Sequence, residues 1–126
     1  MVLSFTKTAL ILAAGFFILA GCQRVINAVD YTTGKVQVEQ KKQADKTLAQ
    51  VKCQELCQTR LSSGDQDFEA GPCLSNAIVP DWVCDVAHNP RQSVDDEVAN
   101  QCPAFREGTA HHFVEVDGNC NLIKVY

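Results

Sequence analysis

Three histidines near the C-terminus could bind a divalent metal or carry out acid–base chemistry. They are His88, His111 and His112, and acidic residues lie between the first and the other two. Imidazole and carboxylate groups are the usual partners in such chemistry. If His111 and His112 lie in a strand, they point to opposite faces, so we expect at most one of them in any single site. The alternative is that all three are polar loop and strand-edge residues.

A second candidate is an alternating run of acids, Asp65, Asp67 and Glu69, placed just before a glycine. Alternating carboxylates in a loop can wrap a calcium ion. The spacing departs from the calcium loop of EF-hands, because the sixth position is Ala70 and the twelfth is Asn76. These six candidates are weak, and a solvated turn is the simpler interpretation of the acidic run.

No stronger signal of catalysis is found. The serines lack the Gly-x-Ser-x-Gly setting of a hydrolase, and there is no phosphate loop or dinucleotide motif. We therefore predict no catalytic residue, no cofactor and no enzyme activity. The net charge of −4, with eleven acidic and three basic side chains in residues 63–126, also excludes nucleic acid as a partner.

The chain has 126 residues and seven cysteines, which is unusually many for a reducing compartment. We predict three disulfides among the last six, which are Cys53, Cys57, Cys73, Cys84, Cys102 and Cys120. The first two are four residues apart on a predicted helix, so their side chains lie side by side and should bond to separate partners. The favoured pairing joins Cys84 to Cys102 and sends Cys53 and Cys57 to Cys73 and Cys120. Zinc is the alternative, although no Cys-x2-Cys pair is present.

The remaining cysteine, Cys22, ends an uncharged apolar stretch that follows Lys7. A short basic start before such a stretch is typical of a secretory signal. Its end, Leu19-Ala-Gly-Cys22, resembles the lipobox of prokaryotic lipoprotein precursors, and the resemblance covers residues 1–22 only. It implies that residues 1–21 are removed as a signal peptide and that Cys22 carries acyl chains such as palmitate.

The elements that would position these residues follow in order. Residues 22–34 form a tether, because Thr32, Thr33 and Gly34 predict a break. Residues 35–62 contain no Pro or Gly and predict an amphipathic helix, with Ser62-Ser63-Gly64 at its end. We expect its apolar stripe to pack on the rest of the chain. That stripe consists of Ala44, Leu48, Val51 and Leu56, with Cys53 and Cys57 at its edge.

Residues 63–126 are predicted to form a small disulfide-stapled head on the end of the helix. Its clearest local signal is a C-terminal β-hairpin, in which residues 112–117 and 121–126 flank Asp117-Gly118-Asn119. Because two strands alone are unstable, the hairpin must lie on the helix or gain a third strand. Trp82 is interpreted as a core anchor stacked on a disulfide, and a surface platform for a ligand is the alternative. The fold class is therefore α+β, with a signal or anchor segment, a long stalk helix and a disulfide-rich head.

These observations predict a non-catalytic lipoprotein, anchored to the cell membrane or outer membrane with its head facing the periplasm or exterior. It would act as a binding or accessory subunit of a cell-envelope assembly, with membrane lipid and an envelope protein as partners. The first alternative is a pilin-like structural subunit or a protein with an uncleaved N-terminal anchor helix. The second is a small metal-dependent enzyme that uses the His and Asp residues of the head.

Overall fold

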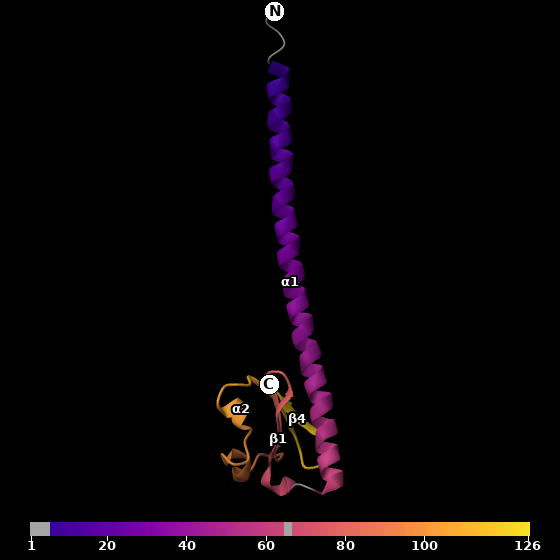
Figure 1. The fold of residues 1–126 in the computed structure, drawn as a ribbon, viewed down its shortest axis with the longest axis vertical. Helices are drawn as coiled ribbons and strands as arrows, with labels where there is room; N and C mark the ends of the chain where they lie inside the picture. The colour runs from indigo at the N-terminus through magenta and orange to yellow at the C-terminus, as the bar shows by residue number, and fades with distance from the viewer. Residues whose placement is uncertain (1–5, 65–66) are drawn as a thin grey trace, which may run out of the picture. The chain divides into compact units, whose positions relative to one another are not determined.

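The computed structural model describes the backbone of residues 6–64 and 67–126, and the side chains of residues 33–64 and 67–126. The fold is a mixed α+β arrangement of one long helix, a four-stranded sheet and several short helical turns (Figure 1). The chain divides into two units, Met1–Lys41 and Lys42–Tyr126. The second is called the globular unit below, and it contains the whole sheet.

The long helix, α1, extends from Thr6 to Ser63. It therefore begins well before the predicted start at Lys35 and continues through Gly34, where the sequence predicted a break. One glycine costs a helix only about 1 kcal/mol relative to alanine, and no proline interrupts this segment. The helix ends at Gly64, whose left-handed φ of 68° lets its amide donate to the Arg60 carbonyl at 3.2 Å.

The predicted signal peptide and the lipidation of Cys22 fall in the part of the chain whose side chains are not described. Within the described part, no helix combines the length and the apolar character that crossing a membrane requires.

The sheet has the order β1-β2-β3-β4. Its strands are β1 (Cys73–Val79), β2 (Trp82–Val86), β3 (His112–Val116) and β4 (Leu122–Val125). Both outer pairs are antiparallel hairpins, and the central pair, β2 with β3, is parallel. A parallel pair needs a long crossover, and here it carries the short helices η2 (Ser93–Asp96) and α2 (Pro103–Arg106).

The predicted C-terminal hairpin is confirmed as β3 and β4. The Asp117 carboxylate closes its turn by accepting hydrogen bonds from the amides of Asn119 at 2.9 Å and Asn121 at 2.8 Å. The hairpin pairs with β2 and also packs on α1. Both contacts provide the support that two strands alone were expected to need. The β1-β2 hairpin was not predicted; its tight turn places Asp81 in the left-handed region, at φ 72°.

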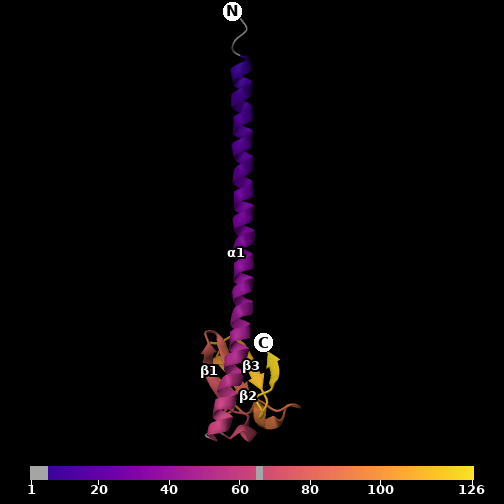
Figure 2. The ribbon, with the colours of Figure 1, turned by 90° about the vertical axis from the view of Figure 1, so that its right-hand side faces the viewer.

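The main core lies between α1 and one face of the sheet (Figure 2). From the helix, Ala49, Cys53 and Cys57 are completely buried, whereas Leu48 and Val51 remain about half exposed. Of the predicted apolar stripe, Leu56 packs against this core as expected, whereas Ala44, Leu48 and Val51 do not become buried. The two cysteines determine which side of the helix faces the sheet, because they form disulfides with Cys84 of β2 and with Cys120, which precedes β4. The sheet contributes Leu74, Val79, Trp82, Cys84, Val86, Val114, Val116 and Cys120 to this core.

All six cysteines of the globular unit form disulfides: Cys53–Cys84, Cys57–Cys120 and Cys73–Cys102. The prediction that Cys53 and Cys57 bond to separate partners is confirmed. In the favoured pairing, a bond from the helix to Cys120 is confirmed, but a bond from the helix to Cys73 was wrong. The favoured bond between Cys84 and Cys102 was also wrong, because these residues lie on opposite faces of the sheet. Cys84 faces α1, whereas Cys102 packs in a second cluster with Val83 and Ala110.

Trp82 is a core residue, as predicted, with 5% of its surface exposed. Its ring stacks on His112, with 4.6 Å between the ring centroids. The predicted partner, a disulfide, belongs to the same core through Cys84 but is not what the indole stacks on.

Candidate functional site

The face of the sheet that is turned away from α1 carries the candidate site. Side chains alternate between the two faces of a strand, so Val83 and Asp85 on β2 share this face with Phe113 and Glu115 on β3. Two of these residues are well buried, since Val83 is 1% and Glu115 8% exposed. The crossover that carries η2 and α2 covers part of this face and leaves a hollow.

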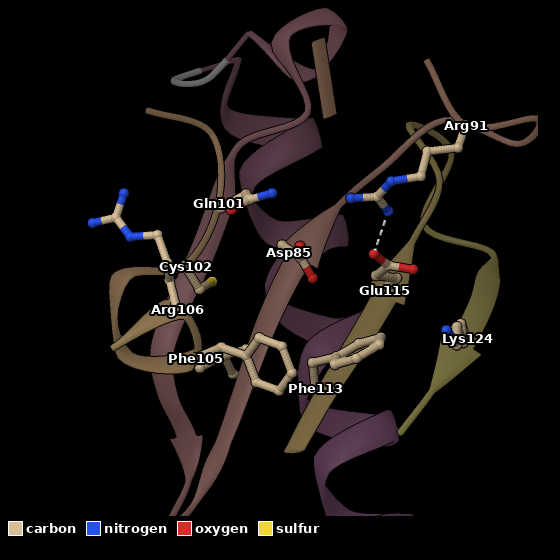
Figure 3. A pocket seen from close by; sticks show the side chains of 10 residues that line it. Asp85, Arg91, Gln101, Cys102, Phe105, Arg106, Phe113, Glu115 and Lys124 are labelled. Atoms are coloured by element: carbon tan, nitrogen blue, oxygen red, sulfur yellow. Dashed lines mark hydrogen bonds and ion pairs between the residues drawn. The ribbon is translucent and has the colours of Figure 1, made fainter. Parts of the chain in front are cut away.

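This hollow, called the sheet pocket here, has a volume of about 640 Å³. That is within the range of roughly 300–1,000 Å³ in which proteins bind small molecules. Figure 3 shows Asp85 in the middle of the pocket, with two phenyl rings on one side and Arg91 and Glu115 on another. The lining residues are Val83, Asp85, Arg91, Gln101, Cys102, Phe105, Arg106, Phe113, Glu115 and Lys124.

Three charged residues form a row across the floor of the sheet pocket. Asp85 on β2 is in register with Glu115 on β3, and Glu115 is in register with Lys124 on β4. Neighbouring strands lie about 4.8 Å apart, so the backbones of Asp85 and Lys124 are about 10 Å apart. The row thus has an acid at one end, a base at the other and a second acid between them.

The central acid, Glu115, already forms an ion pair. Its Oε1 accepts a hydrogen bond from Nη1 of Arg91 at 2.6 Å. The same guanidinium donates through Nε to Asp96 at 3.0 Å and through Nη2 to the Asp95 carbonyl at 3.3 Å. The hydrogen bond to Glu115 raises the pKa of Arg91 above its ordinary value. These contacts occupy Arg91, so neither it nor Glu115 needs a ligand.

Asp85 is in a different situation. Its Oδ1 is buried and has no hydrogen-bond partner among the residues that the structure describes. Burial, and then the negative charge of Glu115, raise the pKa of Asp85 to about 7, although Arg91 acts against this. A buried polar atom without a partner costs roughly 1–3 kcal/mol. The sheet pocket therefore holds one carboxyl group that a ligand with a hydrogen-bond donor could satisfy.

An aromatic wall flanks this carboxyl group. Phe105 of α2 meets Phe113 edge to face, with 5.0 Å between the ring centroids, and Tyr126 stacks on Phe113 at 5.4 Å. The Nζ of Lys124 lies 5.3 Å from the centroid of the Phe113 ring. No ion pair joins Lys124 to a carboxylate in the described part of the chain. The pocket thus has an apolar side wall with an uncompensated cation above it.

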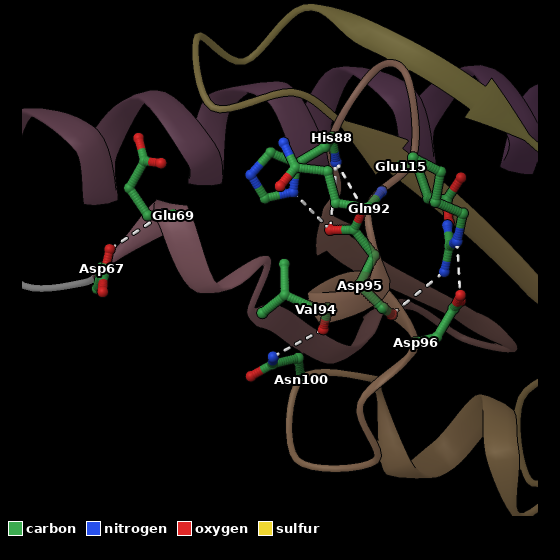
Figure 4. A network of polar contacts seen from close by, with 10 residues as sticks. Asp67, Glu69, His88, Gln92, Val94, Asp95, Asp96, Asn100 and Glu115 are labelled. Atoms are coloured by element: carbon green, nitrogen blue, oxygen red, sulfur yellow. Dashed lines mark hydrogen bonds and ion pairs between the residues drawn. The ribbon is translucent and has the colours of Figure 1, made fainter.

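The loop beside the sheet pocket is organised by Asp95, which is 3% exposed (Figure 4). Its carboxylate accepts from the amide of Gln92 at 2.7 Å and from the amide of His88 at 3.2 Å, and it contacts Nδ1 of His88 at 2.8 Å. Burial alone would raise the pKa of Asp95, but these hydrogen bonds lower it below its ordinary value. His88 is therefore a structural partner of this loop.

The metal candidates fall into two separate places. Asp67, Glu69 and His88 line a second hollow of about 460 Å³, and Asp65 lies outside the described residues. Asp67 caps the short helix η1 (Phe68–Ala70), because its Oδ1 accepts from the Glu69 amide at 2.9 Å. No three His, Cys, Asp or Glu residues are arranged to hold a metal ion in the part of the chain that is described.

The other two histidines both approach Asp81 at the turn of the first hairpin. Nδ1 of His111 lies 2.6 Å from Oδ1, and Nε2 of His112 lies 3.7 Å from Oδ2. The expectation that at most one of them joins a single site assumed that both lie in a strand. His111 precedes β3 and does not follow its alternation, so both histidines can approach Asp81. The contact with His111 contributes most to lowering the pKa of Asp81.

Comparisons with protein-family models, with curated proteins and with solved structures each returned no match. What is shown is therefore the fold, a disulfide-bonded α+β unit, and the sheet pocket on one face of its sheet. Sequence reasoning missed Asp85, Glu115 and Lys124 as a group. A signal was available for the first, since an acid between Cys84 and Val86 in an apolar run is placed where burial is expected.

Proposed function

We propose that this chain is a non-catalytic, extracytoplasmic binding protein held at a prokaryotic membrane by an acyl anchor on Cys22. The observation that carries the binding role is the sheet pocket, in which a buried carboxyl oxygen lacks a partner beside an aromatic wall. The pocket would serve an envelope assembly in which the chain is an accessory subunit with a protein partner.

The cysteines support the location. Six of the seven are paired in disulfides, a state that persists in oxidising compartments and is rare in a reducing cytosol. The seventh is Cys22, at the lipobox-like position, where acylation would remove the remaining thiol. One acyl chain holds a protein only weakly, and two or more give a stable anchor.

The test of the anchor is the substitution Cys22→Ser, expressed in a prokaryotic host that processes lipoproteins. We expect the wild-type chain to sediment with membranes and to have a mass that lacks residues 1–21 and includes acyl chains. The serine variant should lose the acyl adduct, which the mass of the chain reports. Asn27→Ser, five residues further along, is the matched control and should remain acylated.

A second candidate function is favoured by the continuity of α1, which has no break between Thr6 and Ser63. An uninterrupted helix also suits a pilin-like subunit or a protein that keeps its N-terminal helix as an anchor. The same experiment separates the two candidates. An intact N-terminus without an acyl adduct in the wild-type chain would reject the acyl anchor and support the uncleaved helix.

A further inference from the structure

We infer that the sheet pocket binds a small zwitterion with an apolar side chain, such as an aromatic amino acid or a short peptide. The inference rests on the proposed binding function and names the ligand class for that pocket. It follows from three features of the pocket that meet on one face of the sheet: an unpartnered acid, an unpaired base and an aromatic wall.

The acid would bind the positive end of the ligand. Oδ1 of Asp85 is buried without a partner among the described residues, and Figure 3 shows its carboxyl group in the middle of the pocket. An ammonium group offers three donors and the opposite charge, so it would bind the carboxyl group of Asp85, which lines the pocket, through a charge-assisted hydrogen bond. Glu115 cannot take this role, because Arg91 already holds it at 2.6 Å.

The base would bind the negative end. Lys124 lies at the other end of the cross-strand row. Measured across the strands, its backbone is about 10 Å from that of Asp85. Its ammonium group lies over the ring of Phe113, and it forms no ion pair in the described part of the chain. A carboxylate in the pocket would therefore meet a cation that has no competing partner there.

The aromatic wall selects the body of the ligand. Phe113 lies on the middle strand, two residues from Glu115, and contacts Phe105, which is 38% exposed. An apolar or aromatic side chain placed against these rings would remove their surface from water. A simple cation would leave Lys124 unpaired, and a simple anion would leave Asp85 without a donor. A zwitterion satisfies both.

The experiment titrates the full oxidised chain in mild detergent with the dipeptide L-phenylalanyl-L-alanine and follows binding by calorimetry. It is done at about pH 7, where most of the terminal ammonium groups are charged. Two capped forms of the same dipeptide test its ends. We expect N-acetylation to weaken binding at least tenfold, because a hydrogen bond to a charged group is lost. Amidation of the carboxylate should weaken it about two- to fivefold, since Lys124 is exposed.

Two variants assign these effects to residues. In Asp85→Asn the uncapped dipeptide should bind at least tenfold more weakly, and N-acetylation should cost about twofold or less in addition. In Lys124→Gln, amidation of the dipeptide should no longer weaken its binding. The matched controls are Glu107→Gln, which is exposed beside α2, and Lys52→Gln, which is exposed on α1; both should bind like the wild type.

Three results would overturn the inference: no binding at millimolar dipeptide, equal binding of the capped and uncapped forms, or binding that Asp85→Asn does not change. Retained near-ultraviolet circular dichroism and three intact disulfides would show that each variant is folded. None of these outcomes depends on the anchor at Cys22. A failure of the ligand assignment is therefore distinguishable from a failure of the proposed location.

Discussion

At the residue scale, Asp85 and Glu115 are neighbouring carboxyl groups that differ in their partners. They are in register on parallel strands, but only Glu115 contacts a guanidinium, that of Arg91. Asp85 has no such partner, and burial raises its pKa to about 7. The pocket therefore contains one ion pair and one carboxyl group that can change its charge near neutral pH.

The raised pKa of Asp85 predicts how the free energy of unfolding depends on pH. An unfolded aspartate ionises near pH 3.8, whereas folded Asp85 keeps its proton up to about pH 7. Between these values the unfolded chain releases a proton that the folded chain retains, so this group's contribution to the free energy of unfolding falls as the pH rises, and it is constant above about pH 7. The contribution lost is on the order of 2–4 kcal/mol.

The variant Asp85→Asn removes this contribution. Its stability relative to the wild type should rise by about that amount between pH 4 and pH 8, measured by urea unfolding with the disulfides intact. The lowered pKa values of Asp81, Asp95 and Asp117 act at lower pH and cancel in the comparison. Asp96→Asn, an exposed acid nearby, is the control. A constant difference between the Asp85 variant and the wild type would show that Asp85 is ionised like an ordinary surface acid.

At the element scale, local chemistry made some elements predictable and not others. The β3-β4 hairpin was predicted because Asp117-Gly118 specifies a turn between two apolar runs. Strand β2 was missed because Trp82, Val83 and Cys84 are all buried, so the alternation that identifies a half-buried strand is absent. Its parallel pairing with β3 joins residues about thirty positions apart, and no local pattern encodes that contact.

The same reasoning applies to the candidate site. Its acids and base lie on three strands, and only their register brings them into one row. The metal candidates were chosen by residue type, and the structure uses most of them otherwise: Asp67 caps a short helix, His88 binds Asp95, and His111 binds Asp81. Residue types indicated what chemistry was possible, whereas the pairing of distant strands decided which residues meet.

Two glycines provide a test of how the loop elements are held. Gly71 and Gly64 both have left-handed backbones, with φ of 64° and 68°. A Cβ on Gly71 would lie 2.6 Å from Oδ1 of Asp95, whereas a Cβ on Gly64 would have nothing within 4 Å. Alanine at either position incurs the strain of a left-handed residue, about 1 kcal/mol. At Gly71 it must also displace the carboxylate that holds Gln92 and His88.

We therefore expect Gly64→Ala to lower the free energy of unfolding by about 1 kcal/mol and Gly71→Ala by about 2–4 kcal/mol. Chemical denaturation with intact disulfides measures both. The amides of His88 and Gln92 should also exchange faster in Gly71→Ala alone. Equal costs for the two variants would mean that Asp95 moves aside freely and does not organise this loop.

At the scale of the whole molecule, the three disulfides connect distant parts of the chain. Two of them bond α1 to the sheet side of the globular unit, at Cys84 and at Cys120. The third, Cys73–Cys102, fastens the crossover to the opposite face, beside the sheet pocket. Small domains bury too little apolar surface to be stable on that basis alone. The disulfides therefore attach α1 to one face of the short-stranded sheet and the crossover to the other face.

This arrangement predicts a ranking of the disulfides. Cys57–Cys120 closes 63 positions of sequence and Cys73–Cys102 closes 29. Restriction of the unfolded chain then contributes about 4 kcal/mol for the longer loop and roughly 0.7 kcal/mol less for the shorter one. The double variant Cys57→Ser with Cys120→Ser should thus be the less stable of the two double variants in chemical denaturation.

The variant that lacks Cys73–Cys102 should instead lose affinity for the dipeptide, because Cys102 lines the pocket. The prediction would be contradicted if the variant without Cys57–Cys120 lost more affinity for the dipeptide than the variant without Cys73–Cys102. The pocket would then depend on α1, although it lies on the opposite face of the sheet.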